Sequence, residues 1–480
     1  MIDFTIKEVL EKLKAREFSA VELTQAYLDR IEKFGKELNC YITVTPERAL
    51  ADAAESDKRY AAGTARPLEG IPIGMKDLFA TRGILTTAAS RILENFIPEY
   101  ESTVSQKFID AGTVLLGKLN LDEFAMGTFG VSSYFGPAVN PYQMEKRLAP
   151  GGSSSGSVSA VAAGLALGAT GTDTGGSIRY PASLTGLVGL KPTYGLCSRW
   201  GCVAFASSLD HPGPIARTVD DCELMLKAMM GHDPKESTSA NRAVLPAKQG
   251  KLKIGVIKEF AGVEISPEMK ALQGLRLKEL AAAGHEIVEV SVPNILDALA
   301  VYYIINPAEA SSNLARFDGV RYGFRAEADN LIDMYKKTRA QGFGEEVQRR
   351  MVVGTAVLSS ESYDVYFMQA ARVRRKIANG FARAFEQCDL IVCPSGSGPA
   401  IPLSSNLTPL EYYALDLFTA PEDLAGIPAV SVPAGKTAGG LPLGLQVIGR
   451  MFDDLSVLAL GREIEKLAGI DNRPTKILNG

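Results

Sequence analysis

PGGSSSGSVSAVAAGLALGATGTDTGGSIRYP, residues 150–181, is the stretch around which the other segments of the chain are organised. It begins with a Gly/Ser loop, continues as an apolar run of helical length and ends with a second Gly-Gly-Ser. Glycine permits backbone conformations in which successive N–H groups turn toward a small concavity. A single loop of this kind is typical of a linker or a phosphate site, although the second loop lacks the Gly-Lys-Ser/Thr ending of a P-loop. Two such loops in one short segment are unusual, and their role depends on the remaining sequence.

The composition is that of a globular enzyme and shows no electrostatic footprint for nucleic acid. The 480 residues are 46% hydrophobic and 22% charged, with a formal net charge of −4. RNA binding through a protein's own surface normally requires clustered Lys and Arg, whereas here only short pairs such as Arg374-Arg375 occur. We therefore expect that any RNA is held by a partner protein.

Cysteine spacing and hydropathy favour a cytoplasmic protein. There is no Cys-x-x-Cys pair, which predicts free thiols in a reducing compartment at Cys40, Cys197, Cys202, Cys222, Cys388 and Cys393. Residues 1–10, MIDFTIKEVL, predict an amphipathic helix rather than a signal peptide. The apolar run 160–169 is interrupted by glycine and is shorter than the roughly 20 residues of a membrane span.

The scarcity of histidine restricts the possible chemistry. The sequence contains His211, His232 and His285, and no two of them have the spacing of metal ligands. We therefore expect no metal site, and a general base other than histidine.

Strands and helices alternate along the chain, which predicts an α/β protein. Ser19 with Glu22 forms a capping box at the start of a helix. A strand at 253–257, a helix at 267–283 and a strand at 286–292 form a βαβ unit, so at least part of the sheet is expected to be parallel. No linker-like segment or internal repeat divides the chain, which favours one large domain.

Three segments near the Gly/Ser stretch have weaker local patterns. Residues 121–126 are expected to form a short helix, and residues 198–214 a loop-rich connection. Residues 71–75 are strand-like and place Lys76 at their end, beside Asp77. Burial would lower the pKa of Lys76 and make it a base near neutral pH; the alternative is a strand-end lysine paired with Asp77.

One mechanism can connect Lys76 with the two Gly/Ser loops. A neutral lysine would accept a proton from a bridging serine, Ser153, which would accept one from the nucleophile, Ser177. The second loop would offer an oxyanion the backbone N–H groups of Thr174, Gly175, Gly176 and Ser177. Such a Ser-Ser-Lys relay needs no histidine.

These residues resemble the amidase signature family, whose hallmark is Gly-Gly-Ser-Ser followed by Asp-x-Gly-Gly-Ser-x-Arg-x-Pro. The two motifs occur here at residues 151–154 and 173–181. The resemblance implies that Ser177 is the acyl-enzyme nucleophile, that Ser153 is the bridge next to a cis peptide bond, and that Lys76 is the base. It also implies a single large domain, residues 1–480, with a mixed β-sheet covered by helices on both faces. Its signature core would be about 68–215, with the N-terminal helical segment 1–63 packed on it.

Within this family the chain further resembles the glutamine-hydrolysing components of tRNA-dependent amidotransferases. That resemblance is carried by LDEFAMG (121–127), VAFASSLD (203–210), residues 307–323, GFGEEVQRRM (342–351) and LPLGLQVIGR (441–450). It implies a heterotrimer completed by the B and C subunits of the amidotransferase, in which ammonia from glutamine amidates mischarged Glu-tRNA(Gln) or Asp-tRNA(Asn). This chain would need no cofactor, and its partner would use ATP and Mg²⁺.

The same resemblance suggests which residues hold glutamine. Arg350 would bind the α-carboxylate, because a guanidinium matches the geometry of that group. Asp416 would bind the α-ammonium, and Tyr302 would line the pocket. Taken alone, Arg350 could equally be a surface arginine beside Arg349, and Asp416 a solvated turn residue.

The sequence leaves two other functions open. The segment 393–398, CPSGSG, and the pair Glu422-Asp423 depart from the family pattern near the substrate end, which would favour a stand-alone amidase acting on another small amide. A non-catalytic scaffold protein is the other alternative, and the intact relay argues against it.

Overall fold

The computed structural model describes residues 1–478, and a sheet of 11 strands runs through the centre of this part of the chain. The strands are β1 (Tyr41–Val44), β2 (Pro72–Lys76), β3 (Val114–Leu119), β4 (Gly168–Asp173), β5 (Val188–Lys191), β6 (His211–Ala216), β7 (Lys253–Ile257), β8 (Glu286–Val290), β9 (Leu390–Pro394), β10 (Ala429–Lys436) and β11 (Pro442–Ile448). Their order is β1-β3-β2-β4-β6-β5-β10-β11-β9-β7-β8. Parallel pairs such as β7 with β8 and antiparallel pairs such as β10 with β11 both occur, so the predicted mixed sheet is confirmed.

Sixteen α-helices surround the sheet within the described residues. They are α1 (Ile6–Ala15), α2 (Ala20–Leu38), α3 (Pro46–Ala62), α4 (Thr103–Ala111), α5 (Ser155–Ala162), α6 (Arg179–Leu184), α7 (Val219–Met229), α8 (Pro267–Ala282), α9 (Ala298–Asn313), α10 (Leu331–Gly342), α11 (Glu345–Val357), α12 (Met368–Gln387), α13 (Pro409–Ala414), α14 (Ala420–Ala425), α15 (Asp454–Ala468) and α16 (Pro474–Ile477). The capping box of Ser19 with Glu22 is present at the start of α2, as predicted. None of these helices is long and apolar enough to cross a bilayer.

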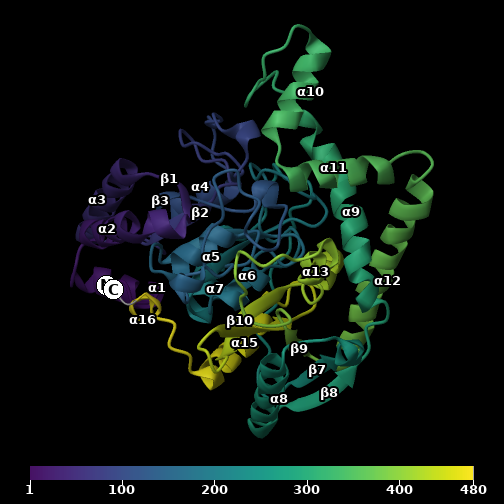
Figure 1. The fold of residues 1–480 in the computed structure, drawn as a ribbon. Helices are drawn as coiled ribbons and strands as arrows, with labels where there is room; N and C mark the ends of the chain where they lie inside the picture. Colours follow the sequence, from purple (N-terminus) through teal and green to yellow (C-terminus); the bar gives the residue numbers. More distant parts are fainter. Residues whose placement is uncertain (479–480) are drawn as a thin grey trace.

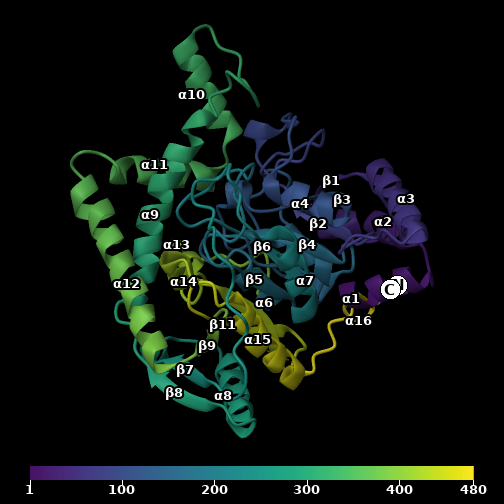
Figure 2. The same cartoon turned by 180° about the vertical axis from the view of Figure 1, so that it is seen from behind.

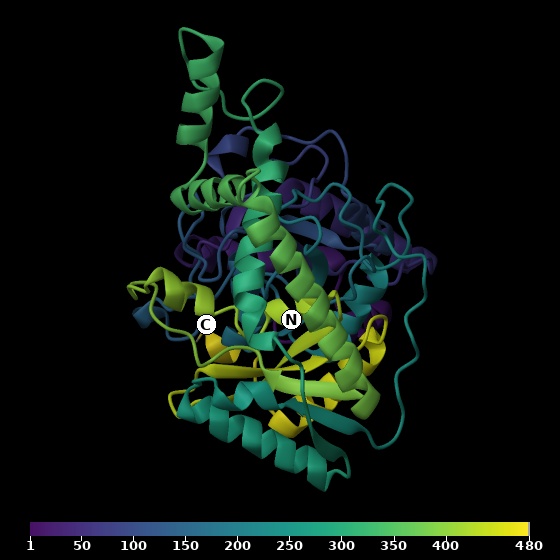
Figure 3. The ribbon, with the colours of Figure 1, turned by 90° about the vertical axis from the view of Figure 1, so that its right-hand side faces the viewer.

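Helices lie on both sides of the strands, which confirms the expected layers. Figure 3 shows α8 below the strands β7 to β11, and α9 with α12 above them. Helices α2 and α3 lie beside β1 at the other end of the sheet, and α10 projects away from the body of the protein (Figure 1). Helix α16 lies near α1 (Figure 2), and the Thr475 hydroxyl donates to the Asp3 carboxylate at 2.6 Å.

The pairing of β2 with β4 brings the two halves of the predicted site together. These strands are parallel, with Ile73 opposite Gly168 and Gly74 opposite Ala169. Because parallel strands end at the same edge of a sheet, Lys76 at the end of β2 and the loop after Asp173 emerge side by side. The backbone N–H of Lys76 also donates to Thr170 Oγ1 at 2.9 Å.

Two of the local helix expectations need correction. The apolar run 160–169 is helical only to Ala162, and the chain enters β4 at Gly168 after passing Gly164 at φ +69°. The expected helix 121–126 is one 3-10 turn, Glu123–Ala125, because Phe124 has a left-handed φ of +52°.

The segment expected as loop, 198–214, contains the start of strand β6. Pro212 and Pro214 argue against a strand in the sequence, because proline has no backbone N–H to donate to a neighbouring strand. Both prolines pair with β4, whereas β5 pairs with β6 at Ile215 and Ala216, beyond them.

We predict that glycine is required where α11 crosses α9. A Cβ at Gly354 would overlap the carbonyl group of Pro307. Gly354→Ala should therefore destabilise the protein by about 1–3 kcal/mol and lower its melting temperature. Gly274→Ala in α8 is the matched control: nothing lies within 4 Å of the added Cβ, so stability should rise by about 0.5–1 kcal/mol. Equal changes in the melting temperature of the two variants, measured by calorimetry, would contradict a steric requirement for glycine at this crossing.

Candidate active site

Lys76 is a fully buried lysine surrounded by hydroxyl groups. Its Nζ lies 2.9 Å from Ser153 Oγ, 2.9 Å from Ser154 Oγ and 2.8 Å from Thr172 Oγ1. Asp77, the alternative partner suggested by the sequence, instead forms a buried ion pair with Lys118 at 3.0 Å. The structure therefore excludes a solvated strand-end lysine, and it brings Lys76 together with Ser153.

The surroundings of Lys76 favour its neutral form. Burial lowers the pKa of Lys76 to about 7, because the ammonium loses its hydration, and nearby acidic groups offset only part of this effect. A substantial fraction of the amine is therefore unprotonated near neutral pH. That fraction can accept a proton from the Ser153 hydroxyl without a structural change.

The two Gly/Ser loops lie next to each other. The peptide bond Gly152–Ser153 is cis, and the N–H of Ser154 donates to the carbonyl of Ser177 at 3.2 Å. Ser153 is fully buried, whereas Ser177 retains 7% exposure. Within residues 1–478 no hydrogen bond joins the hydroxyls of Ser153 and Ser177. The structure thus places Ser177 beside the Lys76–Ser153 pair without closing the relay.

The four backbone N–H groups that the sequence proposes for an oxyanion differ in whether they are already bonded. The N–H of Gly176 donates to Asp173 Oδ1 at 2.6 Å and so is already committed. The N–H groups of Thr174, Gly175 and Ser177 donate to no atom of the described residues. Glycine is required here because a Cβ at Gly175 would overlap the ring of Tyr302.

A buried ion cluster fixes the shape of this loop. Arg179 contacts both carboxylate oxygens of Asp173 at 3.0 Å, and it also contacts Glu422 at 2.9 Å and Asp423 at 2.6 Å. All four side chains are fully buried. Burial acts to raise the pKa of Asp173, but the paired guanidinium outweighs it and holds that pKa well below the ordinary value. Burial raises the pKa of Glu422 to about 7 despite the same guanidinium.

The three residues expected to hold substrate come from separate elements and are all buried. Arg350 lies on α11, Tyr302 on α9, and Asp416 between α13 and α14. Arg350 Nε donates to Glu346 at 2.7 Å, and its buried Nη2 has no partner among the described residues. Neither Arg350 nor Asp416 is therefore a solvated surface group.

The carboxylate of Asp416 is held by hydroxyl groups. It accepts from Thr128 Oγ1 at 3.0 Å and from the hydroxyl of Tyr303 at 2.7 Å. Burial raises the pKa of Asp416 to about 7, and the Tyr303 hydrogen bond and the charge of Arg350 oppose that rise. A positively charged ligand group beside Asp416 would favour its ionised form.

Sequence reasoning did not single out several residues of this site. Tyr303, not Tyr302, bonds Asp416, and Ser154 and Thr172 share the contacts of Lys76. Asp210 accepts from Thr174 Oγ1 at 2.8 Å and so also holds the second loop. Asp210 lies in the family-like segment VAFASSLD, but no local pattern marks its role.

Known proteins of one family match nearly the whole chain. The family model "Amidase" matches residues 22–458. The chain is 50% identical to the A subunit of glutamyl-tRNA(Gln) amidotransferase from Gluconobacter oxydans, covering 98% of each protein. It is 52% identical to the protein of the same name from Caulobacter vibrioides, covering 99% of each.

Solved structures share the whole fold. The A subunit of glutamyl-tRNA(Gln) amidotransferase from Thermotoga maritima is 37% identical, with a TM-score of 0.81, over 98% of this chain and 96% of that one. A peptide amidase from Stenotrophomonas maltophilia is 31% identical, with a TM-score of 0.82, over 98% of both chains. The chain is therefore a member of the amidase family.

Proposed function

We propose that this protein is the glutamine-hydrolysing component of a tRNA-dependent amidotransferase. The observation that carries the proposal is a buried lysine–serine pair together with a buried guanidinium, Arg350, and a buried carboxylate, Asp416, which both contact Tyr303. An amide without charges would gain nothing from that pair of groups. A free amino acid carries one charge of each sign on its α-carbon, and glutamine also has the amide that the relay would cleave.

The proposed reaction begins with two proton transfers. Neutral Lys76 accepts the proton of Ser153, Ser153 accepts that of Ser177, and Ser177 Oγ attacks the side-chain amide carbon of glutamine. The oxyanion is stabilised by the N–H groups of Thr174, Gly175 and Ser177, and the loop needs a small shift before Gly176 contributes. The relay returns a proton to the leaving nitrogen, so ammonia departs. Water then hydrolyses the ester on Ser177 to give glutamate.

Charge complementarity positions the substrate in this proposal. Arg350 binds the α-carboxylate through its unpartnered Nη2, and Asp416 binds the α-ammonium. Tyr302, which packs against Gly175, lies between these groups and the oxyanion loop. Tyr303 and Thr128 hold the Asp416 carboxylate in place.

The assembly is proposed from the names of the glutamyl-tRNA(Gln) amidotransferase relatives. Ammonia passes to the B subunit of a heterotrimer, which the C subunit completes. In the B subunit ATP and Mg²⁺ support amidation of Glu-tRNA(Gln), and Asp-tRNA(Asn) is a further substrate of the same chemistry. The net charge of −4 is consistent with tRNA being held by the partner. This role places the protein in the cytoplasm.

The first prediction tests the function itself. Purified chain should release ammonia from glutamine, and the B and C subunits with ATP and mischarged tRNA should stimulate that release. Ser177→Ala should abolish it, whereas Ser153→Ala should leave a small residual rate because water can replace the bridge. Hydrolysis of other amides, with no response to glutamine or to the partners, would instead identify a stand-alone amidase.

A second prediction concerns pH. Lys76 must be unprotonated to act as a base, so the reactivity of Ser177 should rise as pH increases through about 7. A small neutral fluorophosphonate reacts with Ser177 without binding to Asp416, so its labelling rate reports on the protonation of Lys76. Glutamine hydrolysis would not separate the two groups, because ionisation of Asp416 over the same pH range would also raise its rate. Labelling of Ser177 followed by mass spectrometry at mildly acidic, neutral and mildly alkaline pH would give the profile. Equal labelling at the acidic and alkaline ends, or in Lys76→Ala, would remove Lys76 from the mechanism.

A third prediction separates binding from chemistry. Arg350→Gln and Asp416→Asn should each raise KM for glutamine about ten-fold or more, because each removes a charged hydrogen bond to the substrate. Fluorophosphonate labelling of Ser177 should be nearly unchanged in both. Arg349→Gln is the matched control, since that neighbouring side chain is half-exposed. An Arg350→Gln enzyme with unaltered KM would refute the assigned pocket.

A further inference from the structure

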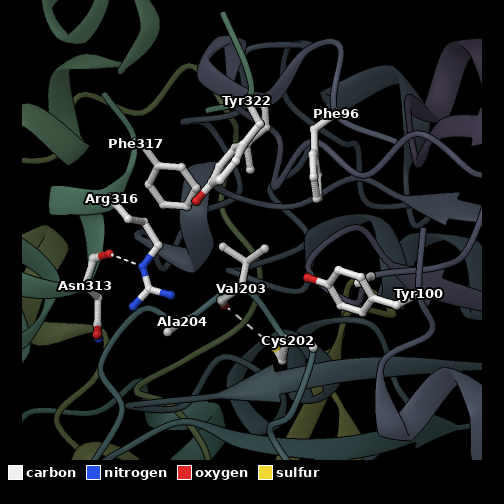
Figure 4. Close-up of a pocket in the computed structure, with 12 residues that line it drawn as sticks. Phe96, Tyr100, Cys202, Val203, Ala204, Asn313, Arg316, Phe317 and Tyr322 are labelled. Carbon is white, nitrogen blue, oxygen red and sulfur yellow. Dashed lines mark hydrogen bonds between the residues drawn. The ribbon is translucent and has the colours of Figure 1, made fainter. Parts of the chain in front are cut away.

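A cavity of about 360 Å³ has a lining that includes none of Lys76, Ser153 and Ser177 (Figure 4). Its floor is the loop Gly201–Ala204, and the end of α9 with the turn that follows it forms one wall. Aromatic rings form much of the remaining surface: the rings of Phe96 and Tyr322 are 5.5 Å apart, and Tyr322 meets Phe317 edge to face at 6.0 Å. This volume and lining are typical of small-molecule sites.

The charge in the cavity comes from one residue. Arg316 is the only charged side chain among the lining residues, and no acidic group accompanies it. Its Nε donates to the carbonyl of Asn313 at 3.0 Å, while its two Nη groups meet no acceptor in the described part of the chain. The side-chain amide of Asn313 is occupied by Phe205 O and Ser207 Oγ, both at 3.1 Å. The guanidinium is therefore available to an anion.

We propose that this cavity binds a small aromatic carboxylate. The ring would lie among Phe96, Phe317 and Tyr322, where apolar area is removed from water. The carboxylate would accept from the free edge of Arg316, which matches that group in shape and charge. Figure 4 shows the hydroxyls of Tyr100 and Tyr322 directed toward the same space, where they supply further donors.

The cavity lining contains none of the proposed relay residues but shares a chain segment with the proposed amide-hydrolysis site. Its floor at Ala204 leads directly to Phe205, whose ring lies 5.6 Å from the guanidinium carbon of Arg350. The N–H of Phe205 in turn donates to Asp210, the residue that holds Thr174. A ligand in the cavity would therefore pack against the segment that continues to Phe205, beside Arg350. The proposal does not depend on glutamine being the substrate.

Phenylacetate is the probe for a binding test on the full chain. Isothermal titration should show saturable binding of phenylacetate and much weaker binding of benzyl alcohol, which keeps the ring but lacks the charge. Arg316→Gln should weaken phenylacetate binding about ten-fold, the loss expected for a charged hydrogen bond. Arg321→Gln is the matched control, because Arg321 lies near Tyr322 but outside the lining. No saturable binding, or equal losses in both variants, would overturn the proposal.

Two further variants establish where the probe binds. The side chain of Val203 projects into the cavity (Figure 4), so Val203→Phe should fill it and abolish binding while the melting temperature shows that the protein is folded. Arg350→Gln should leave phenylacetate affinity unchanged, and loss of affinity in that variant would assign the probe to the substrate pocket. The ring centroids of Trp200, the sole tryptophan, and Tyr100 are 5.4 Å apart. Because Tyr100 lines the cavity, the fluorescence of Trp200 should change as phenylacetate is titrated.

Discussion

The buried contact of Arg179 with Asp173 is the constraint on which the rest of the site depends. One guanidinium joins the loop after β4 to Glu422, which lies 243 residues later in the chain, and to Gln446 on β11. Removing these charges from water is expensive, and the contacts of the carboxylates with the guanidinium offset part of that cost. The second Gly/Ser loop can therefore keep its shape only when the C-terminal part of the protein is folded against it. The conformation of the loop that contains Ser177 therefore depends on contacts between distant parts of the chain.

Burial also sets the proton chemistry of the site. Lys76 and Asp416 lie on different elements, yet the loss of hydration brings the pKa of each to about 7. The direction is opposite in the two cases, because burial disfavours the ammonium of one and the carboxylate of the other. Near neutral pH the protonation state of each group can therefore change when a substrate binds or when the pH changes. Neither behaviour is available to the same residues on a solvated surface.

Much of the relay can be predicted from sequence, because its residues lie in compact motifs. Lys76, Ser153, Ser177 and the glycines of the second loop are identifiable from those motifs, and the parallel βαβ unit β7–α8–β8 from local periodicity. The structure adds that Gly176 donates to Asp173 and that Ser154 shares the contacts of Lys76. Such details depend on where a particular N–H or hydroxyl points, and no sequence pattern records this direction.

By itself the sequence determined the α/β class and the family, and it is the source of the proposed relay residues, since all of these follow from local periodicity and from motifs a few residues long. The tertiary structure alone decided that Asp77 pairs with Lys118 and that Tyr303 holds Asp416. It also decided that Arg350 is buried, that Pro212 and Pro214 belong to a strand, and that Arg316 lines a cavity together with aromatic residues. Each of these depends on contacts between segments distant in sequence, whose partners are chosen by packing, desolvation and the register of strands.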